Sequence, residues 1–257
     1  MKKLKTTGLL LMILLQMWQL KAQQPAPLLI QQSLTAGKPY QVQTIPSILQ
    51  PSSRLEGVLY DQGTLVNSPG TGHGGADESI VFPPLTILAY PSGSPMRTAD
   101  DFTIDDFQWA IDSIAFFDII PNAPTSPSYF SGYYVRIWDG KPGENGSHVI
   151  WGDQSTNRLI SSAWDNLYRR GPENQGSTSL AVFRNICGTG GLVLPAGNYW
   201  LEAQAYSNET AYTYASPVVS VSPTSGNAIQ LNELTNIWES LINNTYCQGM
   251  PFVIFGH

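Results

Sequence analysis

Residues 199–206 read Tyr199-Trp200-Leu201-Glu202-Ala203-Gln204-Ala205-Tyr206. Successive side chains of a β-strand face opposite sides, and side chains two residues apart share a face. One face of this stretch is therefore apolar, with Tyr199, Leu201, Ala203 and Ala205. The other face combines rings with polar groups, namely Trp200, Glu202, Gln204 and Tyr206. This alternation is typical of a strand that borders a core on one side, so it indicates a β-sheet protein.

The segment from Tyr133 to Trp138 has the same pattern, with an apolar set of Tyr133, Val135 and Ile137 and an opposite set of Tyr134, Arg136 and Trp138. Turn sequences such as Asp139-Gly140 and Asn145-Gly146 separate it from other short runs. These runs predict further strands at Gly57–Tyr60, Ile80–Phe82, Leu85–Ala89, Phe102–Ile104, Ile111–Ile120, Val149–Trp151, Ala181–Ile186, Val218–Val221 and Phe252–Phe255.

Together these strands predict an all-β fold, a single antiparallel β-sandwich of jelly-roll type with long loops and at most one or two short helices. Residues 159–168 and 231–241 are the two stretches whose pattern is compatible with a helix. The chain shows no internal repeat and no linker. We therefore predict one domain over residues 56–257.

The N-terminus has the pattern of an export signal. Lys2, Lys3 and Lys5 precede an almost wholly apolar run from Gly8 to Trp18, and Ala22 precedes a polar stretch. Such an order is typical of a secretory signal peptide, which we assign to residues 1–22, followed by an extended lead-in over residues 23–55. The expected location is secreted or periplasmic, without membrane insertion after signal cleavage; a retained N-terminal anchor is the alternative.

The charge of the chain disfavours nucleic acid as its partner. The chain has 257 residues with 13 basic and 19 acidic side chains. Four of the lysines lie in residues 1–22, so the mature chain would keep nine basic residues and a net charge of −10. Nucleic-acid binding requires a clustered basic surface, which this composition does not supply. An acidic surface suits cations or neutral ligands.

Two cysteines, Cys187 and Cys247, are the only ones in the sequence. In an exported domain, two thiols more often form a disulfide than remain free. Their spacing is not that of a C-x-x-C motif, and no histidine is nearby to complete a metal site. We therefore expect a disulfide between Cys187 and Cys247.

Signatures of common enzymes are missing from the sequence. It contains no H-E-x-x-H motif, no G-x-S-x-G motif and no P-loop. Residues 70–75 match G-x-G-x-x-G as text, but Pro69 precedes them and Asp77-Glu78 follow, so we interpret them as a surface loop. A polysaccharide hydrolase needs only two carboxylates across a cleft, and it stays open without a candidate pair.

Acidic pairs suggest a structural Ca²⁺ site. Asp77, Asp100 and Asp101 lie in expected loops near predicted strands, and hard cations prefer oxygen ligands from such loops. Aspartate also caps turns at strand ends, which is the alternative explanation. Calcium is the only cofactor that the sequence suggests.

The outward sets of the two alternating strands suggest a ligand site. Aromatic rings stack on sugar faces, and guanidinium and carboxylate groups bind hydroxyls. If the strands are neighbours, Arg136 and Glu202 can pair between the rings. The candidate binding residues are Tyr134, Arg136, Trp138, Trp200, Glu202, Gln204 and Tyr206. The alternative is that loops or the lead-in cover this face.

A series of turn and strand phrases is similar to a group of exported bacterial β-sandwich ectodomains. The phrases are 59–61, 70–79, 98–104 with Trp109 and Ile114, 138–143 leading to 150–152, 194–201 and 252–256. The resemblance runs from about residue 56 to the end and implies an exported sandwich, often with a C-terminal sorting or anchoring tail. The sequence ends at His257 directly after the last phrase, so a freely soluble exported protein is expected.

Three functions follow as hypotheses. The first is a secreted non-catalytic binding or adhesion module whose ligand is carbohydrate. The second is a structural or interaction protein of the envelope or extracellular matrix. The third is a polysaccharide-acting hydrolase. The partners expected are therefore a glycan or an envelope or matrix component.

Overall fold

The computed structural model describes residues 57–63, 65–87, 89–207, 215–217 and 226–257. This part of the chain is all-β, and its regular elements are strands apart from one 3₁₀ turn, η1 (His73–Gly75). No helix in the described ranges has the length and apolarity needed to cross a lipid bilayer. The expected all-β sandwich class is confirmed. Residues 1–55, assigned to the signal peptide and the lead-in, lie outside the described residues.

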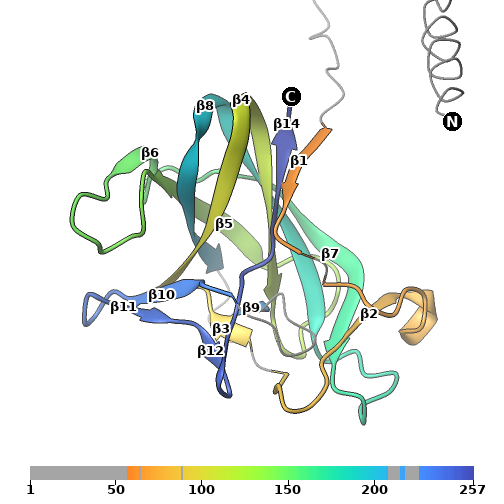
Figure 1. Cartoon of the computed structure of the whole chain (residues 1–257). Coiled ribbons are helices and arrows are strands. Elements are labelled where there is room, and N and C mark those ends of the chain that lie inside the picture. Colours follow the sequence, from red (N-terminus) through yellow and green to blue (C-terminus); the bar gives the residue numbers. More distant parts are fainter. Residues whose placement is uncertain (1–56, 64, 88, 208–214, 218–225) are drawn as a thin grey trace, which may run out of the picture. The chain divides into compact units, whose positions relative to one another are not determined.

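Two long strands organise the molecule (Figure 1). β4 (Met96–Ile119) and β8 (Ala181–Ser207) pair antiparallel along most of their length. The register shifts between Ile104 and Gln108 and again between Ile111 and Ser113. Bulges of this kind bend strands, and both strands turn over at the top of the view. The halves of β4 and β8 on either side of the bend therefore lie in different layers of the sandwich.

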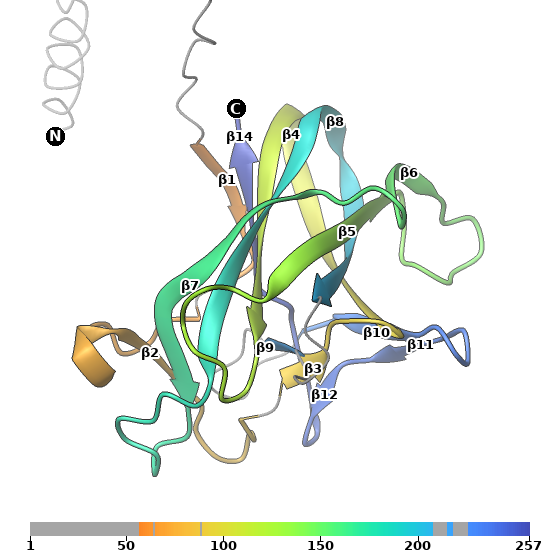
Figure 2. The same ribbon diagram turned by 180° about the vertical axis from the view of Figure 1, so that it is seen from behind.

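The first layer contains the first half of β4 and the second half of β8. Its strands pair in the order β11 (Ile237–Ser240), β10 (Ile229–Asn232), β4, β8, β5 (Phe130–Trp138) and β6 (Val149–Asp153). The second layer has the order β1 (Gly57–Asp61), β14 (Phe252–Gly256), β4, β8, β7 (Leu159–Arg170) and β2 (Asp77–Ile80). All these pairs are antiparallel except β2 with β7. Figure 2 shows the same arrangement from behind.

Four short strands complete the fold. β3 (Ala89–Pro91) pairs with β9 (Ala215–Pro217), which also contacts the end of β4. β12 (Ile242–Asn243) and β13 (Tyr246–Cys247) form a separate hairpin.

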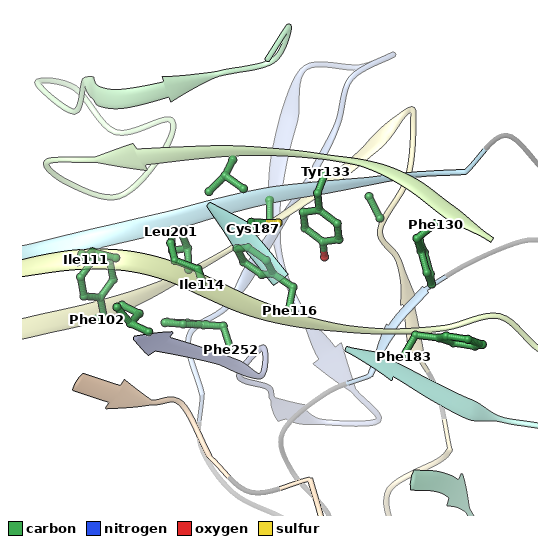
Figure 3. Packing of buried hydrophobic residues seen from close by; sticks show 14 of the residues in the cluster. Phe102, Ile111, Ile114, Phe116, Phe130, Tyr133, Phe183, Cys187, Leu201 and Phe252 are labelled. Atoms are coloured by element: carbon green, nitrogen blue, oxygen red, sulfur yellow. The ribbon is translucent and has the colours of Figure 1, made fainter. Parts of the chain in front are cut away.

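The main core lies between the two layers (Figure 3). The apolar sets expected at Tyr133–Trp138 and at 199–206 both contribute to it, as Tyr133, Leu201 and Ala203 are buried there. The ring of Tyr133 stacks on Phe116 at a centroid distance of 4.8 Å, and its hydroxyl donates to the buried carboxylate of Asp118 at 2.9 Å. Burial of these rings is the main stabilising contribution.

Several strand predictions had the wrong extent. Phe102–Ile104 and Ile111–Ile120 belong to one strand, β4, and Ala181–Ile186 and Tyr199–Tyr206 belong to β8. The stretches compatible with helices, 159–168 and 231–241, are instead β7 and the β10–β11 hairpin, because each pairs with a long neighbouring strand. Of the predicted strand Leu85–Ala89, residues 85–87 are not in a strand and Ala89 begins β3, and Val218–Val221 lies outside the described residues.

The expected disulfide was wrong. Cys187 is buried in the core among the residues of Figure 3, whereas Cys247 is exposed on β13, and both are free thiols. Burial raises the pKa of the Cys187 thiol well above its ordinary value, so this thiol is unreactive in the folded state. The core side of β8 and the surface hairpin face different surroundings, which spacing along the chain does not reveal.

We expect one thiol, Cys247, to react with a thiol-specific disulfide reagent in the native protein, and the second only after unfolding. A reducing agent should leave the thermal midpoint unchanged, because no cross-link constrains the unfolded chain. Both results can be read by absorbance titration and by circular dichroism. A denatured, unreduced sample without titratable thiols would contradict the assignment.

Candidate functional site

The candidate binding residues come together on the outer side of the first layer. β5 and β8 are neighbours, and their register places Tyr134 opposite Gln204, Arg136 opposite Glu202 and Trp138 opposite Trp200. The expected pairing of Arg136 with Glu202 is confirmed by a contact of 2.5 Å between Nη2 and Oε1.

The expectation that this face is open to water was wrong at three positions. Trp200, Glu202 and Gln204 are buried. Tyr134, Arg136 and Trp138 are half-buried, and only Tyr206 of the set is exposed. Local alternation identified the shared face correctly, but other segments cover its centre.

Two segments provide this cover, the β10–β11 hairpin and the loop 139–148. Trp200 packs with Ala99 on β4 and Ile229 on β10, and Trp138 and Trp238 border the same cluster. The loop 139–148 folds back from the end of β5, where the Asp139 carboxylate accepts the backbone N–H of His148 at 2.6 Å. Nζ of Lys141 in this loop lies 5.7 Å from the centre of the Trp200 ring. The Trp200 indole is therefore a core residue rather than a ligand contact.

Glu202 is surrounded by donors. Oε1 accepts from Arg97 Nη1 at 2.8 Å, and Oε2 accepts from Arg136 Nε at 3.1 Å and from the indole Nε1 of Trp138 at 2.7 Å. Burial raises the pKa of Glu202, while the Arg136 charge and the hydrogen bonds from Trp138 and Arg136 oppose that shift. Because protein donors occupy both oxygens, Glu202 has an internal role.

The same network reaches the β10–β11 hairpin. Arg97 Nε lies 3.2 Å from Oε1 of Glu233, which follows β10. Gln204 Nε2 donates to the other oxygen of Glu233 at 3.4 Å. In register, Arg97 pairs with Leu231 on β10, and Leu231 pairs with Trp238 on β11.

A groove of roughly 660 Å³ lies between the loop 139–148 and this hairpin, within the size range of ligand sites. We call it the tryptophan groove; it is lined by Trp138, Lys141, Pro142, Gly143, Glu144, Ser147, Asn236, Ile237 and Trp238. Gly143 packs closely on Trp238, since a Cβ there would lie 2.8 Å from the indole Cδ1. Sequence reasoning missed Trp238: strand alternation in Ile237-Trp238-Glu239 would have separated its ring from its two neighbours, but the face that it shares with Arg97 depends on the pairing of β11 with β10 and of β10 with β4.

The charges exposed in the groove nearly cancel. Lys141 Nζ lies 3.9 Å from Oε1 of Glu144, and both side chains are exposed. Among the groove-lining residues that the structure describes, Glu144 is the one carboxylate. A glycosidase needs two carboxylates across its cleft, so this groove offers no catalytic pair.

The three aspartates expected to bind Ca²⁺ are not brought together. Asp100 and Asp101 lie inside β4 rather than in a loop, and Asp77 begins β2 in the other layer. The buried Asp100 accepts the backbone N–H of Met250 at 2.7 Å and the amide of Gln62 at 3.0 Å, and Asp77 accepts the N–H of Gly70 at 2.8 Å. Within the described ranges, no three His, Cys, Asp or Glu side chains are grouped for a metal ion.

The glycine-rich residues 70–75 form a mostly exposed loop beside the second layer, as expected. Thr71 in this loop donates to Glu78 at 2.7 Å, and Glu78 makes a bidentate pair with Arg170 on β7 at 2.6 and 2.7 Å. The hydrogen bonds from Arg170, and to a smaller extent the one from Thr71, lower the pKa of Glu78, although burial acts in the opposite direction. An anion at this loop would face this buried carboxylate, which disfavours phosphate binding.

No protein-family model and no curated protein matches the chain. A functional proposal therefore depends on the tryptophan groove and on the network beneath it.

Proposed function

We propose that this protein is a secreted, non-catalytic binding module and that a neutral carbohydrate occupies the tryptophan groove. The observation that supports this is the pair of indoles, Trp138 and Trp238, that line one open groove. Flat aromatic surfaces stack on the C–H faces of pyranose rings, and a few polar groups beside them fix orientation. Lys141, Glu144 and Asn236 supply such groups here.

A neutral ligand fits the charges better than an acidic one. Arg97 and Arg136 are engaged by Glu202 and Glu233, and Lys141 is opposed by Glu144. No unopposed cation is therefore available in the groove among the described residues. The chain as a whole is acidic, with a formal net charge of −6, and repels polyanions over distances of about the Debye length, roughly 8–10 Å.

The test is titration calorimetry or affinity electrophoresis with a neutral glucan, xylan and mannan and with an acidic polyuronate. The wild type should bind at least one neutral polymer and not the polyuronate. Trp238→Ala and Trp138→Ala should each weaken that binding about five- to tenfold, as expected for the loss of roughly 1–1.5 kcal/mol of ring contact. Trp164→Ala, which removes an indole from β7 in the second layer, should leave affinity unchanged.

Equal binding by wild type and Trp238→Ala would remove the groove as the site. Absence of binding to every neutral polymer, together with assembly that depends on protein concentration in size-exclusion chromatography, would instead favour a structural or interaction protein.

A further inference from the structure

The buried network below the groove connects its two sides through one carboxylate. On one side, Glu202 Oε2 accepts the indole N–H of Trp138 directly. On the other, Glu202 Oε1 binds Arg97, whose guanidinium also contacts Glu233 at the turn of the β10–β11 hairpin. That hairpin bears Trp238. Along this path the two indoles are connected by the ion pairs of Arg97 with Glu202 and Glu233 and by the paired strands β10 and β11.

Glu202 also constrains the orientation of the Trp138 ring. The indole N–H points to Oε2, which fixes the rotation of the ring about its side-chain bonds. The Arg136 guanidinium, itself bound to Glu202, lies 5.2 Å from the centre of the same ring and covers one of its faces. Trp138 lines the groove, whereas Arg136 is not among its lining residues.

We propose that Glu202 is a positioning residue: it sets the orientation of Trp138 and its separation from Trp238, so that the two indoles form one preorganised surface. This inference rests on the proposed carbohydrate function. The sequence pattern suggested that Glu202 binds sugar hydroxyls, whereas the structure assigns it to the indoles that would contact the sugar.

Burial and charge make this role specific to a carboxylate. Apolar side chains close the neighbouring part of this face, around Ala99, Trp200 and Ile229. A buried ion pair contributes little to net stability compared with apolar packing of the same volume. It does impose defined directions on its partners, because each charged hydrogen bond prefers one geometry. Preorganisation of this kind increases affinity by reducing the ordering required on binding.

The decisive variant is Glu202→Gln, which keeps the side-chain size but removes the charge and half of the acceptor capacity. Affinity for the neutral polymer that the wild type binds should fall about tenfold or more. Quenching of tryptophan fluorescence by acrylamide should increase as Trp138 loses its fixed orientation. Both measurements are made well below the thermal midpoint of each variant.

Glu78→Gln is the matched control. Glu78 is likewise buried and likewise forms a bidentate pair with an arginine, Arg170, but it lies on β2 in the other layer. This variant should lose thermal stability to a similar extent and keep wild-type affinity and quenching. A purely structural role for Glu202 would make the two variants alike.

Trp138→Phe covers the case in which Glu202→Gln does not fold. It retains an aromatic ring in the groove and deletes the N–H that Glu202 accepts, so affinity should decrease severalfold while the fold persists. Wild-type affinity in folded Glu202→Gln, or in Trp138→Phe if the former does not fold, would overturn the positioning role and leave the carbohydrate function intact. A wild type that binds no neutral polymer would overturn the carbohydrate function and the positioning role with it.

Discussion

Raising the pH from about 4 to about 7 should lower the free energy of unfolding of the wild type by about 3–4 kcal/mol more than that of an Asp100→Asn variant. Asp100 is 1% exposed. Burial raises its pKa from 3.8 to about 7, and the neighbouring Asp101 charge adds to this, while the hydrogen bonds from Met250, Asp101 and Gln62 act in the opposite direction.

The sign follows from proton binding. Between the unfolded pKa near 4 and the folded pKa near 7, the folded state holds a proton on Asp100 that the unfolded state has released. The resulting stabilisation is complete below the unfolded pKa and is lost as the pH rises through the folded pKa. Other carboxylates titrate in the same range, so the difference between wild type and Asp100→Asn is the quantity to measure, by urea unfolding at each pH.

Asp101→Asn serves as the control for this prediction. It removes the adjacent half-buried carboxylate on the same strand and leaves the buried one in place, so most of the pH dependence should persist. If the free energies of unfolding of the wild type and of Asp100→Asn change equally with pH across this range, Asp100 is ionised in the folded protein.

Replacing Gly152 with alanine should lower the free energy of unfolding by about 3 kcal/mol or more. Gly152 lies on β6 opposite Arg136 and has a φ of 81°, which costs an L-residue about 1–2 kcal/mol. A Cβ at this position would also clash with the backbone carbonyl oxygen of Val135. Backbone at such a contact cannot move aside without disturbing the β5–β6 pairing, and that pairing supports the groove loop 139–148.

Gly146→Ala separates the two contributions. Gly146 lies in the same loop with a φ of 89°, but a Cβ there would meet nothing within 4 Å. Only the conformational cost of about 1–2 kcal/mol should remain. Urea denaturation of both variants measures the difference; similar losses would show that β6 relaxes around the added methyl group.

The sequence predicted the features that depend on neighbouring residues. Alternation at 133–138 and 199–206 correctly identified which side chains face the core, because a strand fixes the direction of each side chain locally. Alternation also led to the predicted pairing of Arg136 with Glu202. Both residues belong to the polar and aromatic sets that face away from the core, and they lie opposite each other when β5 and β8 are neighbours. The bend that joins the short predicted strands into β4 and β8 was not predicted, because the two bulges depend on how each strand pairs with the other.

By itself, therefore, the sequence determined the all-β class and the face on which each ring lies. Only the tertiary structure decided which rings meet solvent: residues 139–148 and the β10–β11 hairpin, distant from β8 along the chain, close over Trp200 and Glu202 and leave Trp138 beside Trp238. The same holds for Cys187, which lies on β8 in the second layer and is buried in the core between the two layers. Periodicity reports the direction of a side chain relative to its own backbone, whereas burial depends on which remote segments pack against that side.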